Sequence, residues 1–298
     1  MNLARNYEKL KYLVWASTQL AKADTSCPAC NSAATELIKR KYGVTSLWGC
    51  SECYLMFRVP KDNWQINQQF YNNKYDDGFT TETPTDLQLE QLKRDSFSNS
   101  GKDYSGRISL IKAAGVSPGQ TIFEFGCSWG YSSWQLSQAG FRVYSYEVSR
   151  RRAQYASEKL DCTIVDELNP LPEKVDCLYS AHVIEHLPNP RLIWERAAEV
   201  LKPDGVVVLL MPNGEPARAE TEPNYHLIWG QVHPLLLRAK ALHAMASSYG
   251  FHGVAYTSPY DLSAITEGQS GGLGGDELLF IARRVARPDS NSKTKVLD

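Results

Sequence analysis

The sequence of 298 residues predicts an α/β fold: a doubly wound, mostly parallel sheet of seven strands, preceded by a small metal-binding module. Two observations carry this prediction. From residue 121 onward, short apolar segments alternate with segments of helical periodicity, which is typical of a parallel sheet covered by helices on both faces. Upstream of that alternation stand two C-x2-C pairs separated by nineteen residues, Cys27 with Cys30 and Cys50 with Cys53.

The composition is that of a globular protein. Hydrophobic residues make up 43% and aromatic residues 11% of the chain, enough for one large domain and one small one. The formal net charge of −1 argues against nucleic acid or an anionic membrane as a general partner. We see no apolar signal segment and no window apolar enough for a transmembrane helix. Cysteines in metal-type pairs fit a reducing compartment, so we expect a cytoplasmic protein. The sequence does not determine its oligomeric state.

Residues 1–60 are expected to form an N-terminal helix and a zinc ribbon. Apolar residues recur at helical spacing ahead of the first cysteine. Cys27, Cys30, Cys50 and Cys53 have the spacing of two knuckles that each give two thiolates to a tetrahedral zinc ion. Four thiolates leave no open coordination position, so this zinc would be structural. The alternative is four unrelated buried cysteines.

One dense basic run, Lys39-Arg40-Lys41, lies between the two cysteine pairs. Residues 1–60 contain eight lysines and arginines against four acidic residues. A basic run of this kind is most often a solvent-exposed face, and contact with nucleic acid or another polymer is the alternative.

Residues 61–104 form a polar connector rich in Asn, Gln, Asp and Thr, which is either a linker or a lid over a site. Tyr71 and Tyr75 are candidate lid residues. A short amphipathic helix is expected over residues 87–92.

Residues 105–285 carry the strand–helix alternation, and residues 286–298 are expected to be a flexible polar tail. The strands are expected at residues 121–125, 142–147, 162–165, 175–180, 206–211, 253–258 and 277–284. The helices are expected at residues 108–114, 131–139, 149–159, 190–201 and 235–249. A glycine-rich segment, residues 268–275, should be a loop between the last two strands.

The first strand of this domain ends in a turn built on glycines. Gly126 and Gly130 separate the strand from the next helix, and such a turn lets the backbone approach a ligand at a helix N-terminus. Taken alone, two glycines here fit an ordinary tight turn equally well. Glu147 and Asp166 end the next two strands, so their side chains are expected at the same edge of the sheet. Glu147 stands where an acidic residue can accept the two hydroxyls of a ribose.

Several segments together resemble the class I S-adenosylmethionine-dependent methyltransferases. In chain order they are Glu124 to Gly130, Glu147, Asp166, His182 to Pro190 and Leu201 to Gly205. The resemblance covers roughly residues 105–285 and implies S-adenosylmethionine as the cofactor. The residues that it implies at the cofactor are Glu124, Gly126, Cys127, Ser128, Gly130, Glu147, Asp166, Glu167 and His182. A nicotinamide dinucleotide is the competing ligand, but the glycine spacing here is not G-x-G-x-x-G.

Ser128 is the one departure from the family pattern. It stands where these methyltransferases usually have glycine. A serine is tolerated at this position on the condition that its φ angle stays negative, and its hydroxyl would then add a contact.

Cysteine knuckles followed by this domain resemble a branch that methylates small molecules, including nucleotide sugars and glycans. We therefore expect methyl transfer to a hydroxyl or carbon atom of a small molecule, with a sugar nucleotide or glycan as the favoured acceptor. Two alternatives stay open: a quinone- or lipid-type O-methyltransferase, and a zinc-ribbon binding protein on a fold that no longer catalyses.

His182, Glu185 and His186 form an H-x-x-E-H pattern, which also occurs in a class of zinc peptidases. That class needs the pattern on a helix, whereas here it follows a strand and ends before Pro188, so we expect no peptidase. Quinone-biosynthesis O-methyltransferases place two metal-binding carboxylates and a histidine at these positions. Because the first position here is a histidine, Glu185 and His186 are expected instead to order the loop under the cofactor.

A hydroxyl acceptor must lose a proton during methyl transfer, and histidine is the side chain that most often accepts it. His233 is the first candidate, because it precedes a predicted helix where related enzymes carry a histidine facing the substrate. His226 and His182 are the second choices. The alternative for His233 is a core or helix-capping histidine.

Overall fold

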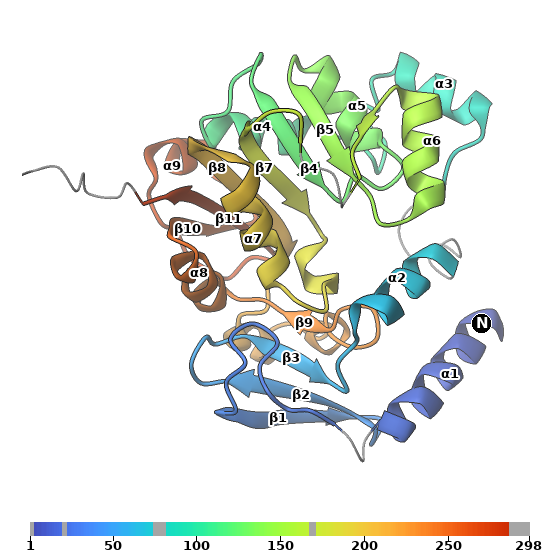
Figure 1. Ribbon diagram of the computed structural model, residues 1–298, viewed down its shortest axis with the longest axis vertical. Coiled ribbons are helices and arrows are strands. Elements are labelled where there is room, and N and C mark those ends of the chain that lie inside the picture. Colours follow the sequence, from blue (N-terminus) through green and yellow to red (C-terminus); the bar gives the residue numbers. More distant parts are fainter. Residues whose placement is uncertain (1–2, 20–22, 74–81, 167–170, 286–298) are drawn as a thin grey trace, which may run out of the picture.

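The computed structural model describes residues 3–19, 23–73, 82–166 and 171–285. They form a large sheet covered by helices and a smaller sheet at the other end of the molecule (Figure 1). Tyr75, Glu167 and the predicted tail lie outside these residues. The helices are α1 (Leu3–Gln19), α2 (Trp64–Asn73), α3 (Asp86–Arg94), α4 (Ser105–Ala113), α5 (Tyr131–Gln138), α6 (Arg150–Leu160), α7 (Arg191–Val200), α8 (Ala239–Ser248) and α9 (Leu262–Glu267).

The larger sheet has seven strands in the order β10-β11-β8-β7-β4-β5-β6. These strands are β4 (Thr121–Phe125), β5 (Arg142–Tyr146), β6 (Thr163–Ile164), β7 (Val175–Ala181), β8 (Leu201–Pro212), β10 (Phe251–Thr257) and β11 (Glu277–Arg284). From β4 the chain adds β5 and β6 in parallel on one side, then β7 and β8 in parallel on the other. β11 runs antiparallel to both of its neighbours, β8 and the edge strand β10. The predicted doubly wound, mostly parallel seven-stranded sheet is confirmed.

Helices cover both faces of this sheet because alternate residues of a strand point to opposite sides. In β8, Val207, Leu209 and Met211 pack in one core with α7 and α8. The intervening Val206 and Val208 pack in a second core with α4, α5 and α9. This two-sided burial explains why β8 is continuously apolar.

The junction of α7 and β8 differs from the prediction. The segment Lys202 to Gly205 was expected to separate the helix from the strand, but β8 already begins at Leu201. Leu201 pairs with Val175 of β7, and the next pair joins Val206 to Cys177. The segment therefore lies at a register shift inside the strand, which a turn-like sequence does not distinguish from a strand start.

The smaller sheet contains β1 (Thr35–Lys41), β2 (Thr45–Cys50), β3 (Met56–Val59) and β9 (Leu235–Leu236), all antiparallel in this order. The two residues of β9 come from the far end of the chain and pair with Met56 and Phe57. The prediction of a helix over residues 235–249 was thus wrong at its start, because α8 begins at Ala239. A short apolar run fits a buried strand as well as a helix, and pairing with β3 decides between them.

The smaller sheet and the large domain share one hydrophobic core. Cys27, Cys50 and Cys53 belong to the same buried cluster as Ala241 and Leu242 of α8. The N-terminal module is therefore packed onto the domain rather than tethered to it.

The connector contains two helices. The amphipathic helix expected at residues 87–92 is α3, and a capping box of Thr85 and Gln88 fixes its first turn. The other helix, α2, lies between the small sheet and the carboxyl edge of the large one (Figure 1). In the part of the chain that the structure describes, no helix is long and apolar enough to cross a membrane.

Candidate active site

The glycine turn follows β4 and has no room for side chains at its two glycines. A Cβ on Gly126 would lie 2.3 Å from Cγ2 of Val183, and one on Gly130 would lie 2.7 Å from Cβ of Ala156. Both glycines have positive φ angles, 94° and 91°, which glycine adopts without strain. The backbone N–H groups of Gly126 and Cys127 donate to the carbonyl oxygen of Tyr146. The turn is therefore held close to the end of β5.

Ser128 does not meet the condition of a negative φ angle. Its φ angle is 53°, in the left-handed region, where a residue with a Cβ is strained. Its backbone N–H donates to Oε2 of Glu147 at 2.8 Å. The turn needs this conformation to direct the N–H toward the carboxylate, and the sequence alone gave no sign of that requirement.

Glu147 connects the two strand ends. While Oε2 accepts from Ser128, Oε1 accepts from the backbone N–H of Ser149 at 2.9 Å. Burial raises the pKa of Glu147, and the two backbone donors and Arg152 oppose that rise. The carboxylate is thus fixed at the carboxyl edge beside the turn, as predicted.

Glu124 lies beneath the turn, within β4. Its side chain is buried and accepts a hydrogen bond from Oγ of Ser133. Burial raises its pKa to about 7, with a further contribution from the charge of Glu147. Glu124 therefore supports the turn from inside the sheet.

The other predicted cofactor residues lie around this turn. Cys127 is fully buried, and burial raises the pKa of its thiol. Asp166 is exposed two residues after β6, at the same edge of the sheet. A backbone turn with no room for a Cβ at its two glycines, and with a fixed carboxylate beside it, has the features needed to hold a nucleoside cofactor.

A second group of polar side chains lies next to the turn. Glu185 and His186 belong to the short 3₁₀ helix Ile184–His186 after β7, and His233 comes from the loop before β9. One ligand atom from each of the three lies within 4.8 Å of the others. The imidazole rings of His186 and His233 have centroids 4.6 Å apart. The predicted role of Glu185 and His186, to order the loop under the cofactor, is compatible with this packing. Together with His233, these two residues also form a candidate metal site.

His182 is held between two carboxylates. Its Nε2 lies 2.7 Å from Oε1 of Glu277, and its Nδ1 lies 3.4 Å from Oε1 of Glu185. Burial acts to lower the pKa of His182, but the two carboxylates outweigh burial and raise it to about 9. Glu277 also binds Arg107 and the hydroxyl of Tyr260. An imidazole held protonated in this way is a poor acceptor of a proton.

His226 is not brought into either group. It is exposed in the short 3₁₀ helix Tyr225–Leu227, and its Nδ1 lies 2.9 Å from the carbonyl oxygen of Pro223. Its own carbonyl oxygen, like that of Trp229, accepts a hydrogen bond from Nζ of Lys41. Lys41, the last residue of the basic run, therefore fastens the loop that carries His233 to β1.

Helix α2 packs over the second group. Nδ2 of Asn67 donates to the carbonyl oxygen of His186 at 2.8 Å, and the ring of Tyr71 meets the His186 ring edge-on. Tyr71 is buried, so α2 covers the His186 side of this group, and a lid over the cofactor stays a prediction.

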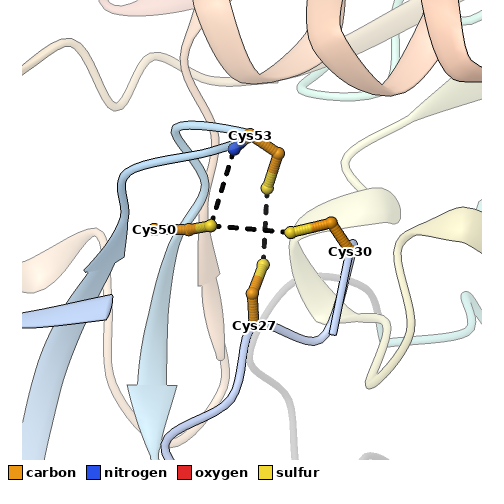
Figure 2. Close-up of side chains that lie close together, drawn as sticks. All are labelled: Cys27, Cys30, Cys50 and Cys53. Atoms are coloured by element: carbon orange, nitrogen blue, oxygen red, sulfur yellow. Dashed lines mark hydrogen bonds between the residues drawn. The ribbon is translucent and has the colours of Figure 1, made fainter. Parts of the chain in front are cut away.

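The four cysteines of the N-terminal module converge as predicted. Figure 2 shows their sulfur atoms facing a common centre, with 3.4 Å between Cys27 and Cys53 and 3.6 Å between Cys30 and Cys50. A disulfide would need about 2.05 Å, whereas tetrahedral zinc with bonds of about 2.3 Å places its sulfurs about 3.8 Å apart. The arrangement fits a four-thiolate metal site.

Sequence reasoning missed Glu277 and Arg107. Glu277 begins the antiparallel strand β11, whose first residue pairs with the end of β8 and so lies at the carboxyl edge. Arg107 reaches it from α4. The one available signal was the acidic pair Asp276-Glu277 that follows the glycine-rich segment.

The strand order and the glycine turn define a class I methyltransferase fold. A family model described as a methyltransferase domain matches residues 99–256, more than half of the chain. The chain belongs to this methyltransferase family.

Curated relatives match a shorter part. The ubiquinone biosynthesis O-methyltransferase of Xanthomonas campestris pv. campestris (strain B100) is 26% identical over 121 residues, 37% of this chain and 51% of that protein. The protein of the same name from Bradyrhizobium diazoefficiens is 28% identical over 100 residues, 30% of this chain and 39% of that protein. The chain thus spans about half the length, or less, of these relatives. Among solved structures, magnesium protoporphyrin IX methyltransferase from Synechocystis PCC 6803 is 17% identical with a TM-score of 0.48, over 75% of this chain and 100% of that one.

Proposed function

We propose that the protein transfers a methyl group from S-adenosylmethionine to a hydroxyl group of a small molecule. The observation that carries the proposal is the glycine turn after β4, where Gly126 has no space for a Cβ and Glu147 is fixed beside it. Membership of the methyltransferase family supports the reaction, and the names of the curated relatives favour oxygen over carbon as the acceptor atom. A sugar nucleotide or glycan acceptor stays a prediction from the sequence.

Each part of the turn has a role in this proposal. The backbone from Gly126 to Gly130 holds the methionine part of the cofactor, Glu147 accepts hydrogen bonds from the ribose hydroxyls, and Asp166 faces the adenine. When bound, S-adenosylmethionine supplies a methyl group already activated by the sulfonium charge. The protein has to align the acceptor oxygen with that methyl group and remove the hydroxyl proton.

Removal of the proton is assigned to the group around His233. The Nδ1 of His233 lies 3.2 Å from the carbonyl oxygen of Ile228. A carbonyl oxygen accepts and cannot donate, so Nδ1 carries the hydrogen and Nε2 keeps a lone pair. We expect turnover to depend on that lone pair. His182, held protonated, and His226, exposed on the outer side of the loop, are less suited to the role.

Calorimetric titration with S-adenosylmethionine tests the cofactor site. Two hydrogen bonds to a charged carboxylate contribute about 1.5–3 kcal/mol each, so Glu147→Ala should weaken binding by at least about 100-fold. The exposed Glu158→Ala on α6 is the matched control and should bind as the wild type does. No binding at millimolar cofactor, or equal affinity in Glu147→Ala, would contradict the proposal and favour a non-catalytic binding protein.

A methyl-transfer assay tests the acceptor class. A catechol, a quinol with an isoprenoid tail and a sugar nucleotide are incubated with the protein and methyl-labelled cofactor. Transfer to either phenolic acceptor supports the quinone- or lipid-type alternative, whereas transfer to the sugar nucleotide supports the acceptor predicted from the sequence. His233→Ala should lower kcat at least 100-fold, which is about 2.7 kcal/mol of barrier, and leave cofactor affinity unchanged.

We also propose that Cys27, Cys30, Cys50 and Cys53 bind one structural zinc ion. Their sulfur–sulfur distances and the burial of three of the four support it, and a closed four-thiolate site has no position for a substrate. Elemental analysis should find zinc in the wild type and one ion fewer per chain in Cys50→Ser. Equal zinc content in the two proteins would contradict the assignment.

A further inference from the structure

We propose that Glu185, His186 and His233 bind a divalent first-row transition-metal ion beside the glycine turn. Their ligand atoms all lie within 4.8 Å of one another. Val183, two residues before Glu185, fills the space next to Gly126, so the cluster adjoins the cofactor turn. The inference rests on the proposed function, because it assigns how the acceptor hydroxyl loses its proton.

The carboxylate of Glu185 is the first observation that points to a cation. Its side chain is 3% exposed, and neither oxygen accepts a hydrogen bond within the described residues. A buried ionised carboxylate that accepts no hydrogen bond is costly even with a charged imidazole near it, and such groups call for a specific explanation. The nearest imidazole nitrogens, Nδ1 of His182 and Nε2 of His186, lie 3.4 Å and 3.9 Å from Oε1. The distance to His186 suits two ligands of one ion better than a direct hydrogen bond.

The two imidazoles provide the second, independent observation. Nδ1 of His186 lies 2.9 Å from the carbonyl oxygen of Val232, and Nδ1 of His233 lies 3.2 Å from that of Ile228. Both Nδ1 atoms therefore carry hydrogen, and both Nε2 atoms keep their lone pairs. A histidine that binds a metal through one nitrogen commonly donates from the other to a carbonyl oxygen, which fixes tautomer and ring orientation.

The ligand set is not the consecutive H-x-x-E-H set of the sequence. The first residue of the H-x-x-E-H pattern, His182, is turned toward Glu277, with 2.7 Å between its Nε2 and Oε1 of that residue. Arg107 and Tyr260 hold the Glu277 carboxylate in place. His233 takes the third position from a distant part of the chain. Its place depends on β9, which begins two residues later and is anchored on β3.

The chemistry of the three groups restricts the ion. Two imidazole nitrogens and one carboxylate suit Zn²⁺, Fe²⁺, Co²⁺ or Mn²⁺, whereas Mg²⁺ and Ca²⁺ prefer oxygen ligands only. Three protein ligands leave positions open for water or for an acceptor hydroxyl. A cation there lowers the pKa of the hydroxyl, whose proton passes to solvent water. The oxygen then forms its bond to the methyl carbon as the carbon–sulfur bond breaks.

The connector supports the ligands from outside. Asn67 on α2 holds the backbone of His186, and Tyr71 packs against its ring. Helix α2 therefore limits the movement of one ligand, as the surroundings of a preformed metal site do.

Cobalt titration tests the site in the full-length protein with its cysteine metal in place. Wild-type protein should bind one equivalent of Co²⁺ with visible bands of nitrogen and oxygen coordination and without the charge-transfer band of cysteine ligation. Glu185→Gln and His233→Ala should each lose this equivalent. His226→Ala, an exposed histidine of the same loop, and His182→Gln should keep it.

Two results would overturn the proposal. One is a wild-type protein that binds no such equivalent. The other is loss of the equivalent in His182→Gln with retention in His233→Ala, which would assign the consecutive set instead. Thermal unfolding and cofactor titration of each variant show that the fold is intact. If the wild-type protein binds the cofactor and transfers the methyl group but binds no cobalt equivalent, the metal site is contradicted and the proposed function stands. If the protein binds the cobalt equivalent but not the cofactor, the proposed function is contradicted and the metal site stands.

Discussion

The small sheet and the carboxyl edge of the large sheet each carry a cluster of side chains of the types that ligate metals, but the two clusters are built differently. Three of the four cysteines are buried in the shared core, and their sulfurs face one another at 3.4–3.6 Å. At the carboxyl edge, by contrast, Glu185 is buried, and neither of its carboxylate oxygens accepts a hydrogen bond within the described residues. Left-handed backbone conformations occur in both regions, at Tyr54 of the small module and at Ser128 of the edge, so the two regions differ in how their polar groups are satisfied rather than in backbone strain.

The largest effect should come from opening the cysteine cluster. Cys50→Ser removes one ligand, and structural zinc contributes about 10–16 kcal/mol in isolated fingers, so the loss should approach the whole stability of the protein. Thermal unfolding followed by circular dichroism measures it. Cys177→Ala, a buried cysteine in the large sheet, is the matched control and should cost about 1–3 kcal/mol. If the two variants lose similar amounts of stability, the cysteine cluster contributes no more to the stability than an ordinary buried cysteine.

The next largest effect is expected at Gly126. In Gly126→Ala the new Cβ would lie 2.3 Å from Cγ2 of Val183, and the alanine would have to keep a φ angle of 94°. Because of this overpacking and left-handed strain, we expect the free energy of unfolding to fall by about 2–5 kcal/mol. Val183→Ala removes the Cγ atoms concerned. A double-mutant cycle by urea unfolding should therefore recover part of the loss, and strictly additive effects would contradict the close packing.

Glu124 gives the edge a dependence of stability on pH. Its folded-state pKa is raised from 4.5 to about 7, so the folded state binds the proton more tightly than the unfolded chain does. Stability should fall as pH rises from about 5 to 7, by on the order of 2–3 kcal/mol. Glu124→Gln should reduce this slope, measured by urea unfolding at several pH values, and the part that remains comes from Glu147, whose pKa burial also raises. The control Glu158→Gln, at an exposed position, should retain the whole pH dependence. An unchanged pH dependence in Glu124→Gln would show that other groups cause it.

The smallest effect should be a gain at Ser128. Because its φ is 53°, Ser128→Gly should stabilise the protein by about 0.5–1 kcal/mol through relief of left-handed strain. The exposed Ser137→Gly within α5 should instead destabilise by about 0.5 kcal/mol, as glycine does in a helix. If both substitutions change the free energy of unfolding in the same direction, as measured by urea unfolding, the prediction that Ser128 is strained is contradicted.

The predictability of the two regions follows from the range of the contacts that form them. The cysteine cluster and β4 with its glycine turn were predictable because spacing and local apolar pattern determine them. The conformation of Ser128 was not, because it depends on the position of Glu147, a residue of the next strand's end. The grouping of His233 with Glu185 depends on β9 joining the small sheet, a pairing that no local pattern of Leu235 and Leu236 indicates.

The two-residue strand β9 also limits how this protein can be rearranged. It places residues of the methyltransferase domain inside the sheet of the N-terminal module, through the pairs Met56 with Leu236 and Phe57 with Leu235. The module therefore cannot be exchanged between methyltransferases as a contiguous cassette of residues 1–60, because the recipient would have to supply a matching strand. A graft that omits β9 would also release the loop that carries His233, so inheritance of the module and of this histidine should be linked.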